Sequence, residues 1–169
     1  NWKFAHAPTP APATATMTGI LDNNTIPAAL DAQTITITNT AGLTKIYKFF
    51  NGGGKSTGQL DSGNVVIQLT GEDTKEGLVD NIEQAIEHAN GHAGTITVTR
   101  SGAVITLEQQ PLVGRNGNTE IVFSAGINTS TELSKTNFSG GSDGGQDDNC
   151  LWWNKKVTKD DAFLPVGDT

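Results

Sequence analysis

Short stretches in which apolar and polar residues alternate run through most of this chain. The clearest covers residues 33–40 (Q-T-I-T-I-T-N-T), where Ile35 and Ile37 share one side and threonines share the other. A period of two residues is that of a β-strand with one buried face. The same pattern predicts further strands over residues 45–50, 64–70, 95–100, 103–108, 119–125 and 133–138.

One segment instead has the period of an amphipathic helix. Its apolar residues recur three and four positions apart: Leu78, Val79, Ile82, Ala85, Ile86 and Ala89. Asp73 is a suitable N-cap with Glu76 three residues later, and Asn90-Gly91 ends the pattern. We predict one helix over about residues 74–90. The order of elements then predicts an α+β fold, a mainly antiparallel β-barrel or sandwich with one packed helix and an N-terminal strand arm.

The chain divides into three parts by composition. Residues 1–29 are predicted to be an N-terminal arm, residues 30–140 the β-barrel-like domain and residues 141–169 a C-terminal docking tail. The arm begins with a strand-like N-W-K-F-A-H-A, and the Pro-rich residues 8–13 follow it. Alternating prolines favour an extended polyproline II spacer of about 3.1 Å per residue, a reach of roughly 19 Å.

Charge and composition exclude several classes of protein. The net charge of -7 disfavours a nucleic-acid partner, because binding to phosphates needs clustered Lys and Arg. No apolar run approaches the roughly 20 residues of a membrane-spanning helix. Cys150 is the single cysteine, which excludes an intramolecular disulfide and a cysteine-based zinc cluster. We expect Cys150 to be a packing residue.

Two candidate motifs do not meet the requirements of the chemistry they resemble. Gly52–Ser56 (G-G-G-K-S) resembles the end of a phosphate-binding loop, but Phe49 stands where that motif needs glycine, and no helix is predicted to follow. His88 and His92 are four residues apart, but the predicted helix ends between them and no third ligand is near in sequence. We interpret the first as a loop before a strand and the two histidines as surface residues.

The acidic residues give no catalytic pair. Asp143, Asp147 and Asp148 lie in a Gly-rich stretch of the kind that binds calcium, but the D-x-D-x-D-G spacing is absent. The remaining carboxylates are scattered over turns and the polar face of the helix, where they favour solubility. We therefore predict a protein that is not an enzyme and that has no catalytic, cofactor-binding or metal-binding residues.

The placement of the aromatic residues is the most informative feature. All three tryptophans, Trp2, Trp152 and Trp153, lie outside the central domain. A small domain rarely carries tryptophan on its appendages without a docking site for it. The predicted assembly interface consists of Trp2, Phe4, Ala5, Ala7, Trp152 and Trp153. The alternative is that both terminal segments fold back on their own domain.

A resemblance to known proteins covers about residues 30–156. The strand 34–38 with Tyr47 and Phe49, the helix end I-E-Q-A-I-E-H-A-N, the hairpin I-T-V-T-R-S-G-A-V-I-T-L-E-Q and the segments G-R-N-G-N-T-E-I and C-L-W-W-N-K-K carry it. Together they resemble a β domain that recurs in virion structural proteins of aquatic bacteriophages. That resemblance implies a structural role and supplies no catalytic residue.

The plan of the chain resembles a second group of proteins. A strand-like N-terminus on a spacer ahead of a β domain is similar to fresh-water fibril protomers that assemble by donor-strand exchange. The resemblance implies a structural protomer of an extracellular or virion-associated helical fibril, whose N-terminal strand inserts into another copy and whose partners are therefore copies of itself. The alternative is a phage decoration or fibre module that binds a capsid or a host-surface glycan, although no residue pattern supports a glycan site.

Overall fold

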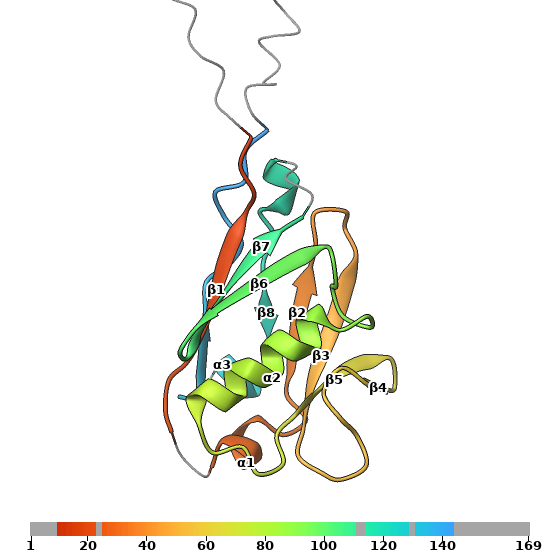
Figure 1. Ribbon diagram of the computed structural model, residues 1–169, viewed down its shortest axis with the longest axis vertical. Coiled ribbons are helices and arrows are strands. Elements are labelled where there is room, and N and C mark those ends of the chain that lie inside the picture. The colour runs from red at the N-terminus through yellow and green to blue at the C-terminus, as the bar shows by residue number, and fades with distance from the viewer. Residues whose placement is uncertain (1–9, 23–24, 111–113, 129–130, 144–169) are drawn as a thin grey trace, which may run out of the picture.

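Two β-sheets and one long helix form the part of the chain that the structure describes, residues 10–22, 25–110, 114–128 and 131–143 of the computed structural model (Figure 1). The sheets pack on each other as a sandwich and do not join into a closed barrel. The predicted α+β class is confirmed, with a sandwich in place of the barrel.

The first sheet has four antiparallel strands in the order β6-β7-β1-β9. Their bounds are Ile96–Ser101 for β6, Val104–Gln109 for β7, Thr14–Gly19 for β1 and Leu133–Lys135 for β9. β6 and β7 form the predicted hairpin, since Ser101 pairs with Val104 across a two-residue turn.

The second sheet has five strands in the order β4-β5-β3-β2-β8. Their bounds are Leu60–Asp61 for β4, Asn64–Gln68 for β5, Thr44–Phe50 for β3, Thr34–Thr38 for β2 and Val122–Phe123 for β8. β2 and β3 form the predicted hairpin. β5 runs parallel to β3 because the chain from 51 to 63 first crosses to the sheet edge, where β4 turns it back.

The alternating strands place their apolar residues between the sheets, as the sequence pattern predicts. Met17 on β1, Ile35 on β2 and Ile105 on β7 are each at most 1% exposed and belong to one continuous core. Burial of a side chain of this size contributes about 1.5–3 kcal/mol to folding. The sandwich is thus held mainly by these inward columns.

The helix α2 spans Lys75–Glu87 and is shorter than the predicted 74–90. Its N-cap is Thr74, whose hydroxyl oxygen accepts a hydrogen bond from the backbone nitrogen of Gly77 at 3.1 Å. The prediction of Asp73 as N-cap was therefore wrong by one residue. Ala89 is exposed because the helix ends before it.

α2 lies against both sheets. It contacts β1, β6 and β7 of the first sheet and β5 of the second. Its buried residues are Leu78, Val79, Ile82, Ala85 and Ile86, the predicted apolar face without Ala89. On the outside, Arg100 of β6 forms ion pairs with Asp80 and Glu83 of α2, each at 2.9 Å.

Three short helical turns complete the described elements. They are α1 at Ile26–Leu30, the 3-10 turn η1 at Arg115–Gly117 and α3 at Ala125–Asn128. In α1, Ile26 and Leu30 are fully buried, which anchors the chain between β1 and β2 to the core.

The predicted boundary between arm and domain at residue 30 falls inside the packed unit. β1, which the sequence pattern assigns to the arm, lies between β7 and β9 in the first sheet. Ala13, Ala15 and Met17 are buried there. The short alternating stretch 13–20 is an integral strand because its apolar column completes the inner face of the sheet.

Candidate functional site

The six residues predicted to form an assembly interface, Trp2, Phe4, Ala5, Ala7, Trp152 and Trp153, lie outside the described residues. Their role stays a prediction. The structure does describe the two points at which the segments that carry them leave the domain, and these points form the candidate site.

Both segments start from a two-stranded ribbon at one end of the molecule (Figure 1). We call residues 10–14 and 139–143 the terminal ribbon. Ala11 and Ser142 exchange backbone hydrogen bonds with nitrogen–oxygen distances of 3.1 and 3.0 Å, and Thr14 and Ser139 do so at 2.9 and 3.0 Å. The N-terminal and C-terminal segments are therefore held side by side where they leave the domain.

The terminal ribbon continues the pairing of β1 with β9. Met17 pairs with Lys135 and Thr14 with Ser139, so one extra residue lies on the C-terminal side between these pairs. This is the arrangement of a β-bulge. Thr136 stabilises the bulge, because its hydroxyl oxygen accepts a hydrogen bond from the backbone nitrogen of Thr16 at 2.8 Å.

The turn η1 fixes the C-terminal half of the ribbon. Arg115 bonds the Asp143 carboxylate through its backbone nitrogen and its Nε, both at 2.9 Å. The Asn118 side chain donates to the carbonyl of Gly141 at 3.1 Å and accepts from its amide at 2.8 Å. These four bonds hold the exit of the C-terminal segment against the end of the sandwich.

The Asp143 carboxylate is thus engaged by Arg115. Asp147 and Asp148, the other two residues of the calcium-like stretch, lie outside the described residues. Within the described part of the chain, no three His, Cys, Asp or Glu side chains gather in a way that would hold a metal ion.

The spacer is shorter than the sequence predicts. Of residues 8–13, Ala11 is paired in the ribbon, Ala13 is buried, and the Ala13 carbonyl accepts from the backbone nitrogen of Gln109 at 3.0 Å. Residues 1–9 of the sequence lead into the ribbon. Fully extended at about 3.3 Å per residue, nine residues span about 30 Å.

Substitution of Asn118 should loosen the terminal ribbon selectively. Asn118→Ala removes both side-chain bonds to Gly141, each worth roughly 0.5–1.5 kcal/mol. We expect the amides of Gly141 and Ser142 to exchange hydrogen about tenfold faster, with little change in α2. Gln84→Ala, which removes only a surface bond to Asp80, is the control. Unchanged exchange at both ribbon amides would contradict the role of Asn118.

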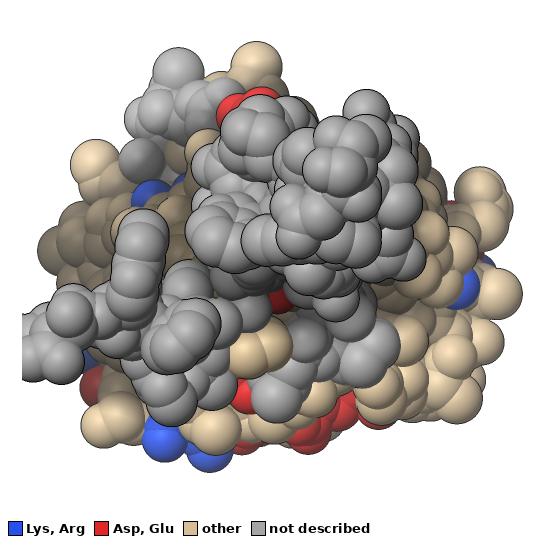
Figure 2. Space-filling model, turned by 90° about the horizontal axis from the view of Figure 1, so that it is seen from above, with Lys and Arg blue, Asp and Glu red and all other residues tan. Residues whose placement is uncertain are grey.

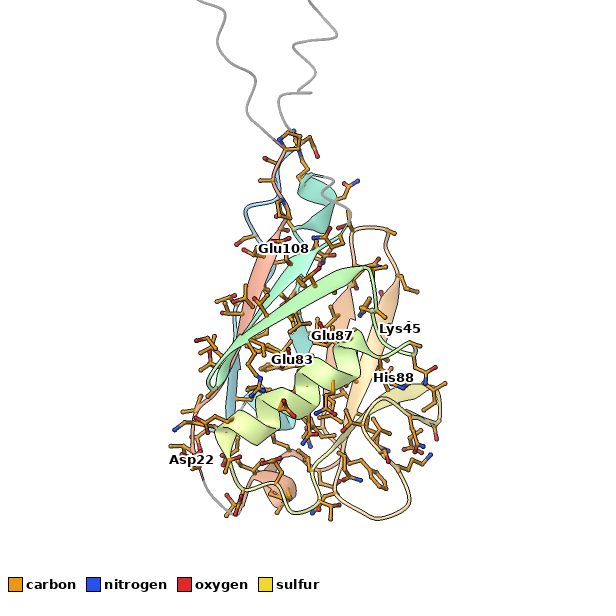
Figure 3. All side chains as sticks on the ribbon, viewed as in Figure 1. Asp22, Lys45, Glu83, Glu87, His88 and Glu108 are labelled. Atoms are coloured by element: carbon orange, nitrogen blue, oxygen red, sulfur yellow. The ribbon has the colours of Figure 1, made fainter. Side chains whose placement is uncertain are left out.

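A second polar feature lies inside the sandwich and was missed from the sequence. His92, predicted to be a surface residue, is 1% exposed and its Nδ1 lies 2.6 Å from the Tyr47 hydroxyl oxygen. The prediction was wrong because the chain after α2 turns inward: the His92 amide donates to the carbonyl of Ile86 at 2.7 Å. His88 is on the surface, as predicted (Figure 3).

The partners of His92 define its protonation. Its Nε2 lies 3.2 Å from the Leu43 carbonyl, which can only accept, so Nε2 carries the proton and Nδ1 accepts from the Tyr47 hydroxyl. Burial lowers the pKa of His92, and the nearby charge of Lys45 lowers it further. Burial also raises the pKa of the Tyr47 hydroxyl. The pair is therefore neutral and joins β3 to the loop before β6.

Gln109 is a second buried link that the sequence did not reveal. At the end of β7, its side-chain oxygen accepts from the backbone nitrogen of Thr40 at 2.9 Å, and its nitrogen donates to the Thr38 carbonyl at 3.1 Å. One amide thereby ties the first sheet to the second. A sequence signal existed, because Gln109 occupies the inward position of an alternating strand.

The glycine-rich segment Gly52–Ser56 is a loop, as predicted. The Gln68 side chain donates to the carbonyls of Gly52 and Lys55 at 2.9 and 2.6 Å, and the edge strand β4 follows the loop. The Lys55 ammonium group bonds the Leu60 carbonyl and forms an ion pair with Asp61 at 3.2 Å. The lysine therefore closes its own loop.

Comparisons with known proteins add no relative. No protein-family model matches the sequence, and neither the curated proteins nor the solved structures contain a match. Among the described helices, none has the length and apolar character that crossing a membrane requires.

Proposed function

We propose that this chain is a structural protomer that joins copies of itself into an extracellular or virion-associated fibril. The observation that carries the proposal is the terminal ribbon. It brings the starts of both tryptophan-bearing segments to one end of a sandwich whose apolar columns are already packed on each other. A folded body with linking segments at one end suits an assembly in which the N-terminal strand of one copy binds to the next copy.

The N-terminal segment is proposed to be the linking strand. Residues 1–7 alternate as a strand does, and burying Trp2 and Phe4 in a neighbour would contribute about 1.5–3 kcal/mol each. Among the described strands, β6 is the longest that pairs on one side only. Its six residues nearly match the seven of the segment, and a strand added to it would gain backbone hydrogen bonds along that length.

Donor and acceptor are different surfaces, so the contact is heterologous. A heterologous contact propagates into an open filament unless the rotation between copies closes a ring. The proposal therefore requires an assembly whose length increases with protein concentration.

Deleting residues 1–7 tests the linking role. We expect the truncated protein to remain monomeric by light scattering at concentrations where the full chain forms filaments in electron micrographs. A synthetic Asn1–Ala7 peptide should raise its melting temperature. Filaments of normal length from the truncated protein would refute the proposal.

A pair of double variants tests the alternation within the segment. Trp2→Ala with Phe4→Ala should abolish filaments, because both side chains lie on one side of the predicted strand. Lys3→Ala with Ala5→Ser changes two residues on the other side and is the control, which should still assemble. Equal effects of the two pairs would contradict insertion as a strand.

A further inference from the structure

The outer face of the first sheet carries almost no charge. Its outward positions are Thr14, Thr16, Thr18, Thr97, Thr99, Ser101, Val104, Thr106, Glu108, Ser134 and Thr136, and we call this surface the hydroxyl face. Thr99, Thr106 and Thr16 stand in register across three strands. Glu108 is the only charged residue of the set, and its carboxylate accepts from the Gln110 side chain at 2.9 Å (Figure 3).

The outer face of the second sheet carries an exposed apolar row. Thr36 of β2 pairs with Ile46 of β3 on one side and with Val122 of β8 on the other. Ile46 is 42% exposed and Val122 is 48% exposed. We call the surface of these three residues and their threonine neighbours the Ile46–Val122 face.

The Ile46–Val122 face also lacks unpaired charge. Its outward residues on β2, β3 and β8 are Thr34, Thr36, Thr38, Thr44, Ile46, Lys48, Phe50 and Val122. Lys48 is the only charged member, and its ammonium group lies 2.9 Å from the Asp61 carboxylate.

Charge gathers elsewhere on the molecule. The described residues include seven Lys or Arg and thirteen Asp or Glu, a net formal charge of -6. The exposed side of α2 carries Glu76, Asp80, Glu83 and Glu87. Seen from above, most of the visible acidic atoms lie along the lower edge of the view, which is the α2 side (Figure 2). Two copies of so acidic a body repel each other least where the hydroxyl face of one meets the Ile46–Val122 face of the other.

We infer that the Ile46–Val122 face of one copy packs against the hydroxyl face of a second copy. The inference rests on the proposed self-assembly and names a second contact within it. Threonine suits such a contact because its methyl group adds apolar area while its hydroxyl pairs with hydroxyls opposite. Sheets stack about 10 Å apart, so the row of Ile46 and Val122 would bury its apolar area against Thr16, Thr106 and Val104.

The size of the faces determines when the contact forms. Four strands about 4.8 Å apart and six residues long give a face roughly 20 Å on each side. That area is below the roughly 800 Å² per partner of a stable complex. The contact therefore forms only between copies that the terminal segments already hold together, because linkage raises their effective concentration to about the millimolar range.

Lysine substitutions on the Ile46–Val122 face test the inference. Ile46→Lys with Val122→Lys should raise the concentration at which the full chain forms ordered filaments at least tenfold, while pairs of copies joined by the N-terminal segment still form. Gln84→Lys with Ala89→Lys adds the same two positive charges at exposed residues on α2 and just after it, and is the control, which should assemble as the unchanged chain does. Melting temperatures confirm that each variant folds.

Placing opposite charges on the two faces tests which face is the partner. Thr16→Glu with Thr106→Glu on the hydroxyl face should weaken assembly alone, and should restore it when combined with the two lysines on the same chain. Normal filaments from the lysine variant, or no restoration in the combined variant, would overturn the inference. Suppose that either of those results is found, but that deleting residues 1–7 abolishes all association. The face contact is then rejected, and the proposed linkage through the N-terminal segment stands.

Discussion

Below pH 6.5 the free energy of unfolding should fall by up to about 1.4 kcal/mol for each pH unit, down to the pKa that His92 has in the folded protein. Burial lowers the pKa of His92 in the folded protein from its ordinary value of 6.5. The unfolded chain then binds a proton that the folded protein does not accept. The contribution of the neutral His92 to the free energy of unfolding is therefore fully present above pH 6.5, and it is lost progressively as the pH falls below that value.

The acidic groups with shifted pKa values act in a different window. Lysine partners lower the pKa of Asp22 and of Asp61 from 3.8, so their contributions are lost only below that value. A slope between pH 6.5 and about 4.5 therefore has His92 as its principal source among the groups with resolved shifts.

Urea unfolding at several pH values measures the slope. His88→Gln, which alters an exposed residue, should leave it unchanged. His92→Phe should remove it, and should also lower the stability at pH 7.5 by about 1–3 kcal/mol, because the Tyr47 hydroxyl and the Leu43 carbonyl lose their partner. A slope that survives in His92→Phe would show that another group causes it.

Local pattern predicted the parts of the fold that depend on neighbours in sequence. Thr34–Thr38 is a strand because its β-branched residues alternate, and α2 is a helix because its apolar residues recur at helical spacing. The hairpin partners followed because a tight turn brings adjacent strands together. These predictions hold because each requires only contacts within about fifteen residues along the chain.

The terminal ribbon could not be predicted in the same way. Ala11 pairs with Ser142 across 131 positions, and neither residue has a side chain that marks a partner. The predicted start of the domain at residue 30 was too late for the same reason. Ala13 and Ala15 have small side chains, and only the neighbouring strands β7 and β9 show that they are buried.

The buried Tyr47–His92 pair was missed for a different reason. Periodicity describes strands and helices, whereas His92 lies in a loop whose path depends on the packing of α2. The sequence did hold one indication. Tyr47 is the only tyrosine in the chain and occupies an inward position of a strand, and a buried tyrosine hydroxyl requires a partner.

Gly91→Ala should destabilise the protein by about 3 kcal/mol, because the glycine allows the loop after α2 to turn beneath the last turn of the helix. A Cβ atom at residue 91 would meet the Ala85 carbonyl oxygen and would lie 2.7 Å from that of Ile86, and neither is a flexible side chain. Overpacking against a rigid backbone typically costs about 1–3 kcal/mol. Here the next residue is His92, whose amide donates to the same Ile86 carbonyl, so the shift also displaces the buried histidine.

Gly53→Ala is the matched control, since a Cβ there meets nothing within 4 Å and the residue has no positive φ. It should leave stability unchanged or raise it by about 0.4–1 kcal/mol, by restricting the unfolded chain. Urea unfolding at pH 7.5 compares the two variants, and the pH series then separates the causes in Gly91→Ala. If His92 moves into water, its pKa returns towards 6.5 and the slope below pH 6.5 becomes smaller. A Gly91→Ala protein that keeps both its stability and the full slope would show that the loop accommodates the methyl group without moving His92.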